Sequence, residues 1–389
     1  MEMRRVYLDN SATTRMAEEV LHAMMPYLTD KMGNPNSLHL WGREAKIAMD
    51  AARESVASLI GASAQEIVFT GSGSAADNLA IKGAVWADKK REKRHVITSA
   101  VEHHAVLDTF KWLGKNGYDV TFLPVDEYGA TRPETLEGAI RDDTLLVSVM
   151  FANNEVGTIN PIARLGEICR RRGVLFHTDA VQAAGHVPID VKELPVDMLT
   201  MSAHKMHGPK GVGALYMKKG IKLVPLVHGG GQEYGLNSGT ENVAEIVAFG
   251  EAARLASKML REGEPARVSR LRDKLLDGII ERIPDSFVTG HRVERLPFHG
   301  SVCVRRIEGE GMLLRMDYAG IGVSSGSACT SGSLDPSHVL LAMGLDHETA
   351  HGSVRLTLSR YTTEEDIDYV LEKFPPIVET LRRMSPYKV

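Results

Sequence analysis

The sequence predicts an α/β protein whose central sheet is mostly parallel. Short apolar runs alternate with helical patterns through the middle of the chain, which is 389 residues long and 43% hydrophobic. Strands that alternate with helices are joined by crossover connections, and such connections place neighbouring strands parallel. The length is sufficient for two domains and a large core.

Six apolar runs are expected to form the strands of this sheet. They cover residues 66–70, 95–100, 119–125, 144–152, 174–180 and 196–203. Helical patterns lie between them, such as residues 75–93 and 161–173. Ligands of parallel sheets bind beyond the carboxyl ends of the strands. The residues that follow each strand are therefore the first candidates for a functional site.

The last third of the chain indicates a second, smaller α+β domain. A charged helical stretch covers 251–283, and strands are expected at 301–307 and 353–359. Thr362 and Glu365 have the spacing of a capping box at the start of a terminal helix. We expect a large domain of residues 16–255 and a small domain formed by residues 1–15 and 256–389.

Composition argues against several classes of protein. The net charge of −4 does not suit a dedicated nucleic-acid binder. No apolar run approaches the roughly 20 residues needed to cross a bilayer, and the N-terminal residues contain no apolar signal core. Three scattered cysteines cannot form a disulfide framework, so we expect a reducing, cytoplasmic location with free thiols.

The glycine-rich loop after the first of these strands has three readings. Backbone amides of residues 71–74 could cradle a phosphate at a helix start. Gly71, Gly73 and Ala76 also match a dinucleotide fingerprint, with Glu102 after the next strand as a ribose-binding acid. A tight strand–helix turn without a ligand is the third reading. The loop alone does not decide among them.

Later strand ends favour pyridoxal phosphate. Asp179 and Gln182 follow one strand, and Ser202, His204 and Lys205 follow another. By itself Lys205 would be a solvated surface lysine. A lysine desolvated at a strand end has a lowered pKa, and its neutral amine can capture an aldehyde cofactor. An aspartate such as Asp179 can keep the nitrogen of a pyridine ring protonated.

The three cysteines have different surroundings. Cys329 lies in "SSGSACTSGS" (324–333), a run of small residues typical of a loop, whereas Cys303 lies in "GSVCVRRI" and Cys169 in "GEICRRRG". We expect Cys169 to pack in a helix and Cys303 in a strand core. A thiol within a small-residue loop indicates a chemical role for Cys329.

Ten motifs, spread over nearly the whole chain, resemble those of one family. They are "YLDNSATT", "NPNSLHLWGREA", "ADNLAIKG", "EHHAVLD", "NNEVGTINPI", "HTDAVQAAGHVPID", "SAHKMHGPKG", "NSGTEN", "SSGSACTSGS" and "VRLTLSRYTTEEDID". The chain resembles the group I cysteine desulfurases, pyridoxal-phosphate enzymes of NifS and IscS type related to the class V aminotransferases. The resemblance implies the aminotransferase-like fold type I.

The resemblance also implies roles for individual residues. Lys205 would bind the cofactor covalently and move protons, His103 would lie over its ring, and Cys329 would receive the sulfur. Asn154 and Arg355 would bind the substrate carboxylate, a task that suits the planar fork of arginine. The implied cofactor-binding residues are Gly73, Ser74, His103, Asn154, Asp179, Gln182, Ser202, His204, Lys205 and, from the partner subunit of a homodimer, Thr240.

The implied activity is conversion of L-cysteine to L-alanine, with the sulfur held as a persulfide on Cys329. Acceptor proteins for iron–sulfur cluster assembly, such as an IscU- or NifU-like scaffold protein, would then receive it, with tRNA thiolation as a further outlet. No membrane and no direct nucleic-acid contact are expected. Two positions depart from the family: Ser74-Ala75 replaces Thr-Glu in the phosphate loop, and Asn237 replaces an arginine.

Other interpretations are weaker. An aminotransferase or a dehydrogenase leaves Cys329 without a task, and selenocysteine lysis would be a different reaction on the same scaffold. A docking module without catalysis does not explain Lys205, His103 and Asp179 together. The pairs His103–His104 and His204–His207 suggest a metal, but no cysteines join them at close spacing. The run 89–94 is expected to be a solvated helix end or a docking patch for an acidic partner.

Overall fold

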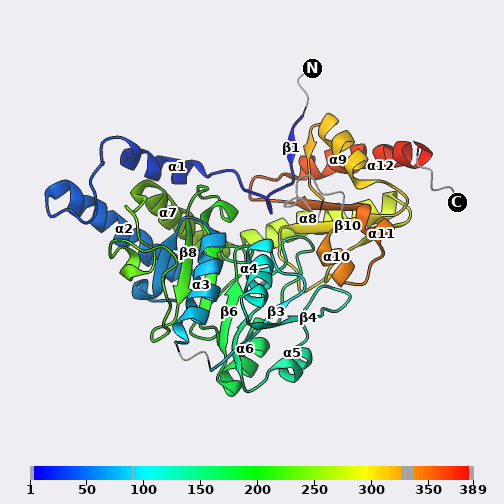
Figure 1. Ribbon diagram of the computed structural model, residues 1–389. Coiled ribbons are helices and arrows are strands. Elements are labelled where there is room, and N and C mark those ends of the chain that lie inside the picture. Colours follow the sequence, from blue (N-terminus) through cyan, green and yellow to red (C-terminus); the bar gives the residue numbers. More distant parts are fainter. Residues whose placement is uncertain (1–3, 90–91, 326–335, 385–389) are drawn as a thin grey trace.

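A seven-stranded sheet forms the centre of the computed structural model, which describes residues 4–89, 92–325 and 336–384 (Figure 1). All its strands run in one direction except β8, which is antiparallel to both neighbours. In spatial order the strands are β2 (Ile67–Thr70), β8 (Gly213–Met217), β7 (Met198–Ser202), β6 (Leu175–Asp179), β5 (Thr144–Ser148), β3 (His95–Ser99) and β4 (Asp119–Leu123).

The six strands expected from the apolar runs are confirmed, and so is the mostly parallel sheet. Strand β8 was not anticipated. Its five residues, "GALYM", form a short run directly after a glycine-rich turn, and their length and pattern do not distinguish a strand from a loop.

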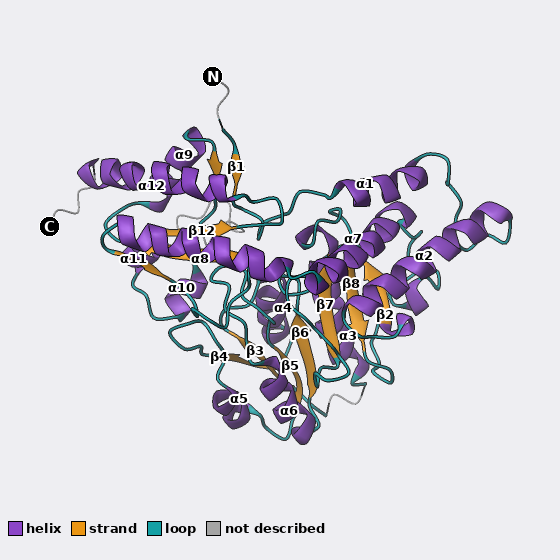
Figure 2. Cartoon of the chain, turned by 180° about the vertical axis from the view of Figure 1, so that it is seen from behind, coloured by secondary structure: helices purple, strands orange, loops and turns teal. Residues whose placement is uncertain are grey.

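Helices cover both faces of this sheet, as successive strand residues point to opposite sides. Val68 packs with α3 (Gly73–Ala87) and α4 (His104–Lys115). Its neighbours Ile67 and Phe69 pack into the core on the opposite face. The helices of that face are α2 (Leu40–Leu59), α5 (Pro133–Ala139), α6 (Ile162–Arg172) and α7 (Val243–Arg261), with α1 (Glu18–Met24) against α7. Figure 2 shows helices flanking the strands of this sheet.

A smaller antiparallel sheet lies beside the carboxyl ends of the parallel strands. It contains β9 (Ser286–Val288), β10 (His299–Val304) and β12 (Ser353–Thr357), with β10 in the middle. The accompanying helices are α8 (Glu264–Arg282), α9 (Gly309–Tyr318), α10 (His338–Ala342), α11 (His347–His351) and α12 (Glu364–Met384). The N-terminal β1 (Val6–Tyr7) joins this region by pairing with β11 (Ile321–Gly322). The expected division at residue 255 stays a prediction.

Two local expectations were wrong. Helix α3 ends at Ala87, so Lys89, Glu92, Lys93 and Arg94, the described residues of the charged run, lie after it and do not form its end. The capping box of α12 uses Thr363 and Asp366, whose side chains each accept a hydrogen bond from the other's amide at 3.3 and 3.1 Å. The hydroxyl of Thr362 instead accepts from the amide of Ser359 at 3.0 Å.

Candidate active site

A cavity of about 300 Å³ opens at the carboxyl ends of the parallel strands. It collects residues that were separate candidates in the sequence. Ten of the twelve predicted site residues line it, namely Gly73, Ser74, His103, Asn154, Asp179, Gln182, Ser202, His204, Lys205 and Arg355. Thr240 does not line it and is exposed, and Cys329 lies outside the described residues.

One side of the cavity is the strand-end wall, formed by Asp179, Ser202 and Lys205. Asp179 is the last residue of β6, Ser202 is the last of β7, and Lys205 ends the short 3-10 helix η3 (Ala203–Lys205) that follows. Adjacent parallel strands β6 and β7 hold these side chains in fixed register. Local sequence and sheet pairing together therefore place a carboxylate and an amine at one edge.

Asp179 is buried, and burial raises its pKa to about 6. The backbone amide of Val181, which donates to its Oδ1 at 2.9 Å, and the nearby charge of Lys205 partly offset that effect. The ammonium of Lys205 in turn donates to the carbonyls of Ser11 and, at 2.9 Å, of Ala12. This wall thus contains a desolvated carboxyl group and a cation held by backbone oxygens.

The first turn of α3 closes the cavity beside this wall. The hydroxyl of Ser72 caps the helix by accepting from the amide of Ala75 at 3.1 Å. Gly73 permits close approach, because a β-carbon there would lie 2.9 Å from a methyl of Val181. A helix N-terminus of this kind favours an anion such as phosphate.

His103 lies at the mouth of the same cavity and caps α4. Its Nδ1 accepts a hydrogen bond from the amide of Ala105 at 3.1 Å. Burial, with the charge of Lys205, lowers the pKa of the imidazole to about 4. The ring is therefore neutral near pH 7, and its proton resides on Nε2, since Nδ1 must present a lone pair.

Another part of the lining is the cross-chain wall, formed by Asn154 and Arg355 and named for their distance apart in the sequence. Glu155 and His338 adjoin this wall outside the cavity lining. Arg355 is only 2% exposed, and its terminal nitrogens donate to the Asn154 carbonyl at 2.9 Å and to the Asp9 carboxylate at 3.0 Å. Arg355 and Asn154 are 201 positions apart in the chain. The ion pair with Asp9 occupies part of the guanidinium fork that the sequence suggested for a substrate carboxylate.

The residues present fit pyridoxal phosphate. Ser11 Oγ and Arg355 Nε, both in residues of the cavity lining, are buried and have no hydrogen-bond partner within the described part of the chain. These polar atoms, the helix N-terminus, the lysine and the buried carboxyl match a ligand that combines phosphate, aldehyde and ring nitrogen. A metal is less well supported, because no three His, Cys, Asp or Glu side chains of the described residues gather to hold one.

Several cavity residues were missed by the sequence reasoning. Ser11 and Asp77 stand in matched motifs, but neither was given a role. Asp77 is fully buried near His177 (3.7 Å), and burial raises the pKa of its carboxyl. The sequence signal that could have identified Asp77 is its position as a polar residue among the apolar residues of a buried helix. Position in the chain did not indicate which groups Asp77 would meet.

The remaining cysteines agree with expectation. Cys169 in α6 and Cys303 in β10 are buried, and burial raises the pKa of each thiol to about 12.

Of the departures from the family pattern, Asn237 donates to the Phe69 carbonyl at 3.0 Å, and Ser74 is exposed in the first turn of α3. None of the helices in the described ranges combines the length and apolar character that a bilayer crossing requires.

Comparison with known proteins identifies relatives along the whole chain. Residues 6–370 match the family model for aminotransferase class-V. A cysteine desulfurase IscS of Methanosarcina thermophila is 51% identical over 385 residues, which cover 99% of this chain and 95% of that protein. A solved NifS-like protein is 41% identical with a TM-score of 0.91, covering 97% of this chain and all of the other. A structure described as SspA in complex with cysteine is 36% identical, with a TM-score of 0.81 over 92% of this chain and all of the other.

Proposed function

The chain belongs to the class V aminotransferase family as a cysteine desulfurase of NifS/IscS type, and from that premise we propose how its residues divide the reaction. The proposed reaction converts L-cysteine to L-alanine and passes the sulfur, as a persulfide on Cys329, to acceptor proteins of iron–sulfur cluster assembly. The observation that supports it most directly is the convergence of Lys205, Asp179, His103 and Arg355 on one cavity.

Pyridoxal phosphate would be held chiefly from the strand-end side. The amides at the start of α3, with Ser74, Ser202 and His204, would bind its phosphate, and Lys205 would bind its aldehyde. When bound, the cofactor would capture the substrate amine and accept electrons from the substrate carbons. Asp179 would bond the ring nitrogen and Gln182 the ring hydroxyl.

The substrate would be held from the other side. Arg355 and Asn154 would bind its carboxylate, with the Asp9 ion pair fixing the guanidinium in place. His103 would assist proton transfer through Nε2, because its Nδ1 already accepts the hydrogen bond that caps α4. Lys205 would move protons at the substrate carbons once the substrate amine has replaced it.

Cys329 would take the sulfur. Its thiolate forms an S–S bond to the substrate sulfur while the substrate Cβ–S bond breaks, and the electron pair of that bond stays with the carbon. Protonation of that carbon gives alanine, and Cys329 is left with a persulfide. An acceptor thiol or an added reductant then removes the outer sulfur.

A homodimer is supported by an exposed apolar patch at the start of α2. Leu38, Leu40, Trp41 and Ile47 are 92%, 53%, 52% and 68% exposed. Patches of this kind mark interaction surfaces in soluble proteins. The patch adjoins the segment of Thr240, because Asn36 donates to both carboxylate oxygens of Glu241 at 3.1 and 3.0 Å. The family resemblance implies that a second copy, for which this patch is the proposed contact, receives Thr240 at its phosphate site.

Alanine formation tests the proposed function. The purified protein, loaded with pyridoxal phosphate, is given L-cysteine and a reductant that discharges persulfide. We expect catalytic alanine from the wild type. Cys329→Ser should keep the bound cofactor but lose sulfide release, whereas Cys169→Ser should behave as wild type because that thiol is buried in α6. No alanine from the loaded wild type, or normal sulfide release by the Cys329 variant, would overturn the proposal.

The remaining assignments stay predictions. They are the scaffold protein as acceptor, an additional outlet to tRNA thiolation, and a cytoplasmic location.

A further inference from the structure

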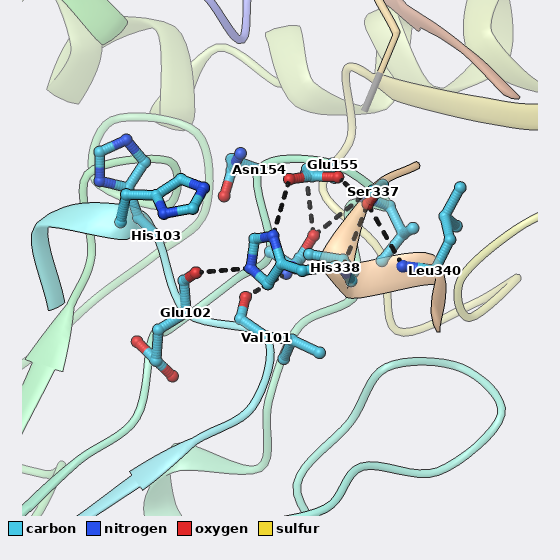
Figure 3. Close-up of polar contacts among 12 residues, drawn as sticks. Val101, Glu102, His103, Asn154, Glu155, Ser337, His338 and Leu340 are labelled. Atoms are coloured by element: carbon cyan, nitrogen blue, oxygen red, sulfur yellow. Dashed lines mark hydrogen bonds and ion pairs between the residues drawn. The ribbon is translucent and has the colours of Figure 1, made fainter. Parts of the chain in front are cut away.

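A polar bridge outside the predicted site connects His103 to the far side of the cavity. His338, the first residue of α10, lies between Glu102 and Glu155 (Figure 3). Its Nε2 contacts the Glu102 carbonyl at 3.1 Å, and its Nδ1 lies 4.0 Å from the Glu155 carboxylate. Glu102 is the residue directly before His103, so the ring contacts the peptide group that joins the two.

Glu155 is anchored on the other side of this bridge. The Ser337 hydroxyl donates to its carboxylate and accepts from the amides of Val339 and Leu340 at 3.1 and 3.3 Å. Glu155 also directly follows Asn154, whose carbonyl accepts from Arg355 at 2.9 Å and from His299 at 3.0 Å. The bridge therefore links the backbone at His103 with the backbone at Asn154, whose carbonyl in turn accepts from the Arg355 side chain.

The contacts define where a proton must lie. A carbonyl oxygen can only accept, so the Nε2 of His338 carries hydrogen. If His338 were neutral and Glu155 ionised, the Nδ1 lone pair would face a carboxylate at 4.0 Å. One proton on either group removes this repulsion. Burial raises the pKa of Glu155 to about 7, against the opposing effects of the Ser337 hydrogen bond and the Arg355 charge.

The charged surroundings of His338 are also defined. Burial lowers its pKa, its bond to the Glu102 carbonyl raises it, and the neighbours His104 and Lys111 lower it while Asp108 raises it. The rings of His104 and His338 lie 5.0 Å apart between centroids. His104 thus perturbs His338 without touching Glu155.

We propose that Glu155 and His338 are positioning residues of the desulfurase, a pair that carries one proton on one group or the other and thereby holds His103 and Asn154 at the geometry that the reaction needs. This inference rests on the proposed function. Loss of that proton at high pH leaves the Nδ1 lone pair facing an ionised carboxylate, and the repulsion displaces His338, together with the Glu102 carbonyl that it contacts, from Glu155. Small displacements of reacting groups reduce turnover strongly.

The choice of variants follows from the single proton that Glu155 and His338 carry between them. Glu155→Gln imitates the state in which one proton is present, because its amide oxygen can accept from Ser337 while its neutral NH2 group, rather than a carboxylate, faces Nδ1 of His338. His338→Leu removes both contacts, and His338→Gln keeps a donor for the Glu102 carbonyl. His104→Gln is the matched control, since it removes a neighbouring imidazole that does not contact Glu155.

Turnover by the holoenzymes as a function of pH is the first readout. We expect His338→Leu to lower kcat about tenfold and His338→Gln to recover most of that loss. The pH profile of kcat/KM should lack one alkaline ionisation in Glu155→Gln and should retain that ionisation in His104→Gln. Variants that change only the melting temperature, with wild-type kcat and pH profile, would overturn the inference and leave the pair as a helix anchor.

Histidine NMR titration of the same holoenzymes is a second readout, independent of turnover. Glu155→Gln should lower the pKa of His338 because the carboxylate that stabilises its imidazolium is removed, whereas His104→Gln should raise it. A His338 pKa that Glu155→Gln leaves unchanged would contradict the shared proton. A wild type that binds the cofactor but makes no alanine would instead sink the proposed function, and the titration would still test the pair.

Discussion

The strand-end wall and the cross-chain wall face the same cavity but are held in different ways. Asp179 and Ser202 end adjacent strands of one sheet, and backbone pairing fixes their separation. The cross-chain wall is held by side-chain contacts between residues far apart in the sequence, since Arg355 contacts Asn154, 201 positions away, and Asp9, 346 positions away. We infer that the first wall suits a ligand that stays bound, and the second suits a substrate that comes and goes.

The largest effect is expected on the strand-end wall. Lys205→Ala removes the amine that would bind the cofactor and move protons, so alanine formation should fall by about a thousandfold or more. The absorbance band of the lysine-linked cofactor should disappear as well. Lys210→Ala, an exposed lysine five residues further on, is the control. Retained activity in Lys205→Ala would remove the chemical distinction between the two walls.

A smaller and different effect is expected on the cross-chain wall. Arg355→Lys keeps a charge but loses the planar fork, so KM for cysteine should rise about tenfold while kcat changes less. Cofactor absorbance should persist because the strand-end wall is intact. Arg295→Lys alters another buried arginine outside the cavity lining and should leave KM unchanged. If Arg355→Lys instead lost the cofactor, substrate and cofactor binding could not be divided between the walls.

The smallest effect concerns the contribution to stability of Glu102, which is buried directly before His103 and outside the cavity lining. Burial raises the pKa of its carboxyl from 4.5 to about 8, although bonds from Ser99 and the Met150 amide oppose this. The folded protein therefore holds a proton that the unfolded chain releases, and this group makes folding less favourable as pH rises from 4.5 to 8.

Glu102→Gln should abolish that contribution. Its melting temperature relative to wild type should increase between pH 5 and pH 8.5 by about 1 °C for each kcal/mol involved, given the unfolding entropy of a chain of 389 residues. The exposed Glu134→Gln serves as the control. An equal difference in melting temperature at both pH values would show that Glu102 is ionised in the folded state.

The difference between the walls also explains what the sequence could predict. Alternating strands and helices located the strand ends, and these carry Asp179, Ser202 and Lys205. No local pattern predicts that Ser337 would meet Glu155, because the two residues are 182 positions apart. The terminal helix presented a related ambiguity. Thr362–Glu365 and Thr363–Asp366 have the same spacing, and only the competing bond from Ser359 to Thr362 decides between them.

His103 has a consequence for the evolution and engineering of this enzyme. The same imidazole caps α4 and is proposed to act on the substrate, so selection for a correctly started helix and selection for rate act on one side chain. His103→Ala removes both functions, whereas His103→Asn restores a good capping group without an imidazole. Comparing those two replacements separates the fitness cost of misfolding from the cost of slow chemistry. Because one histidine serves both purposes, few single substitutions at this position can preserve both the start of the helix and the reaction rate.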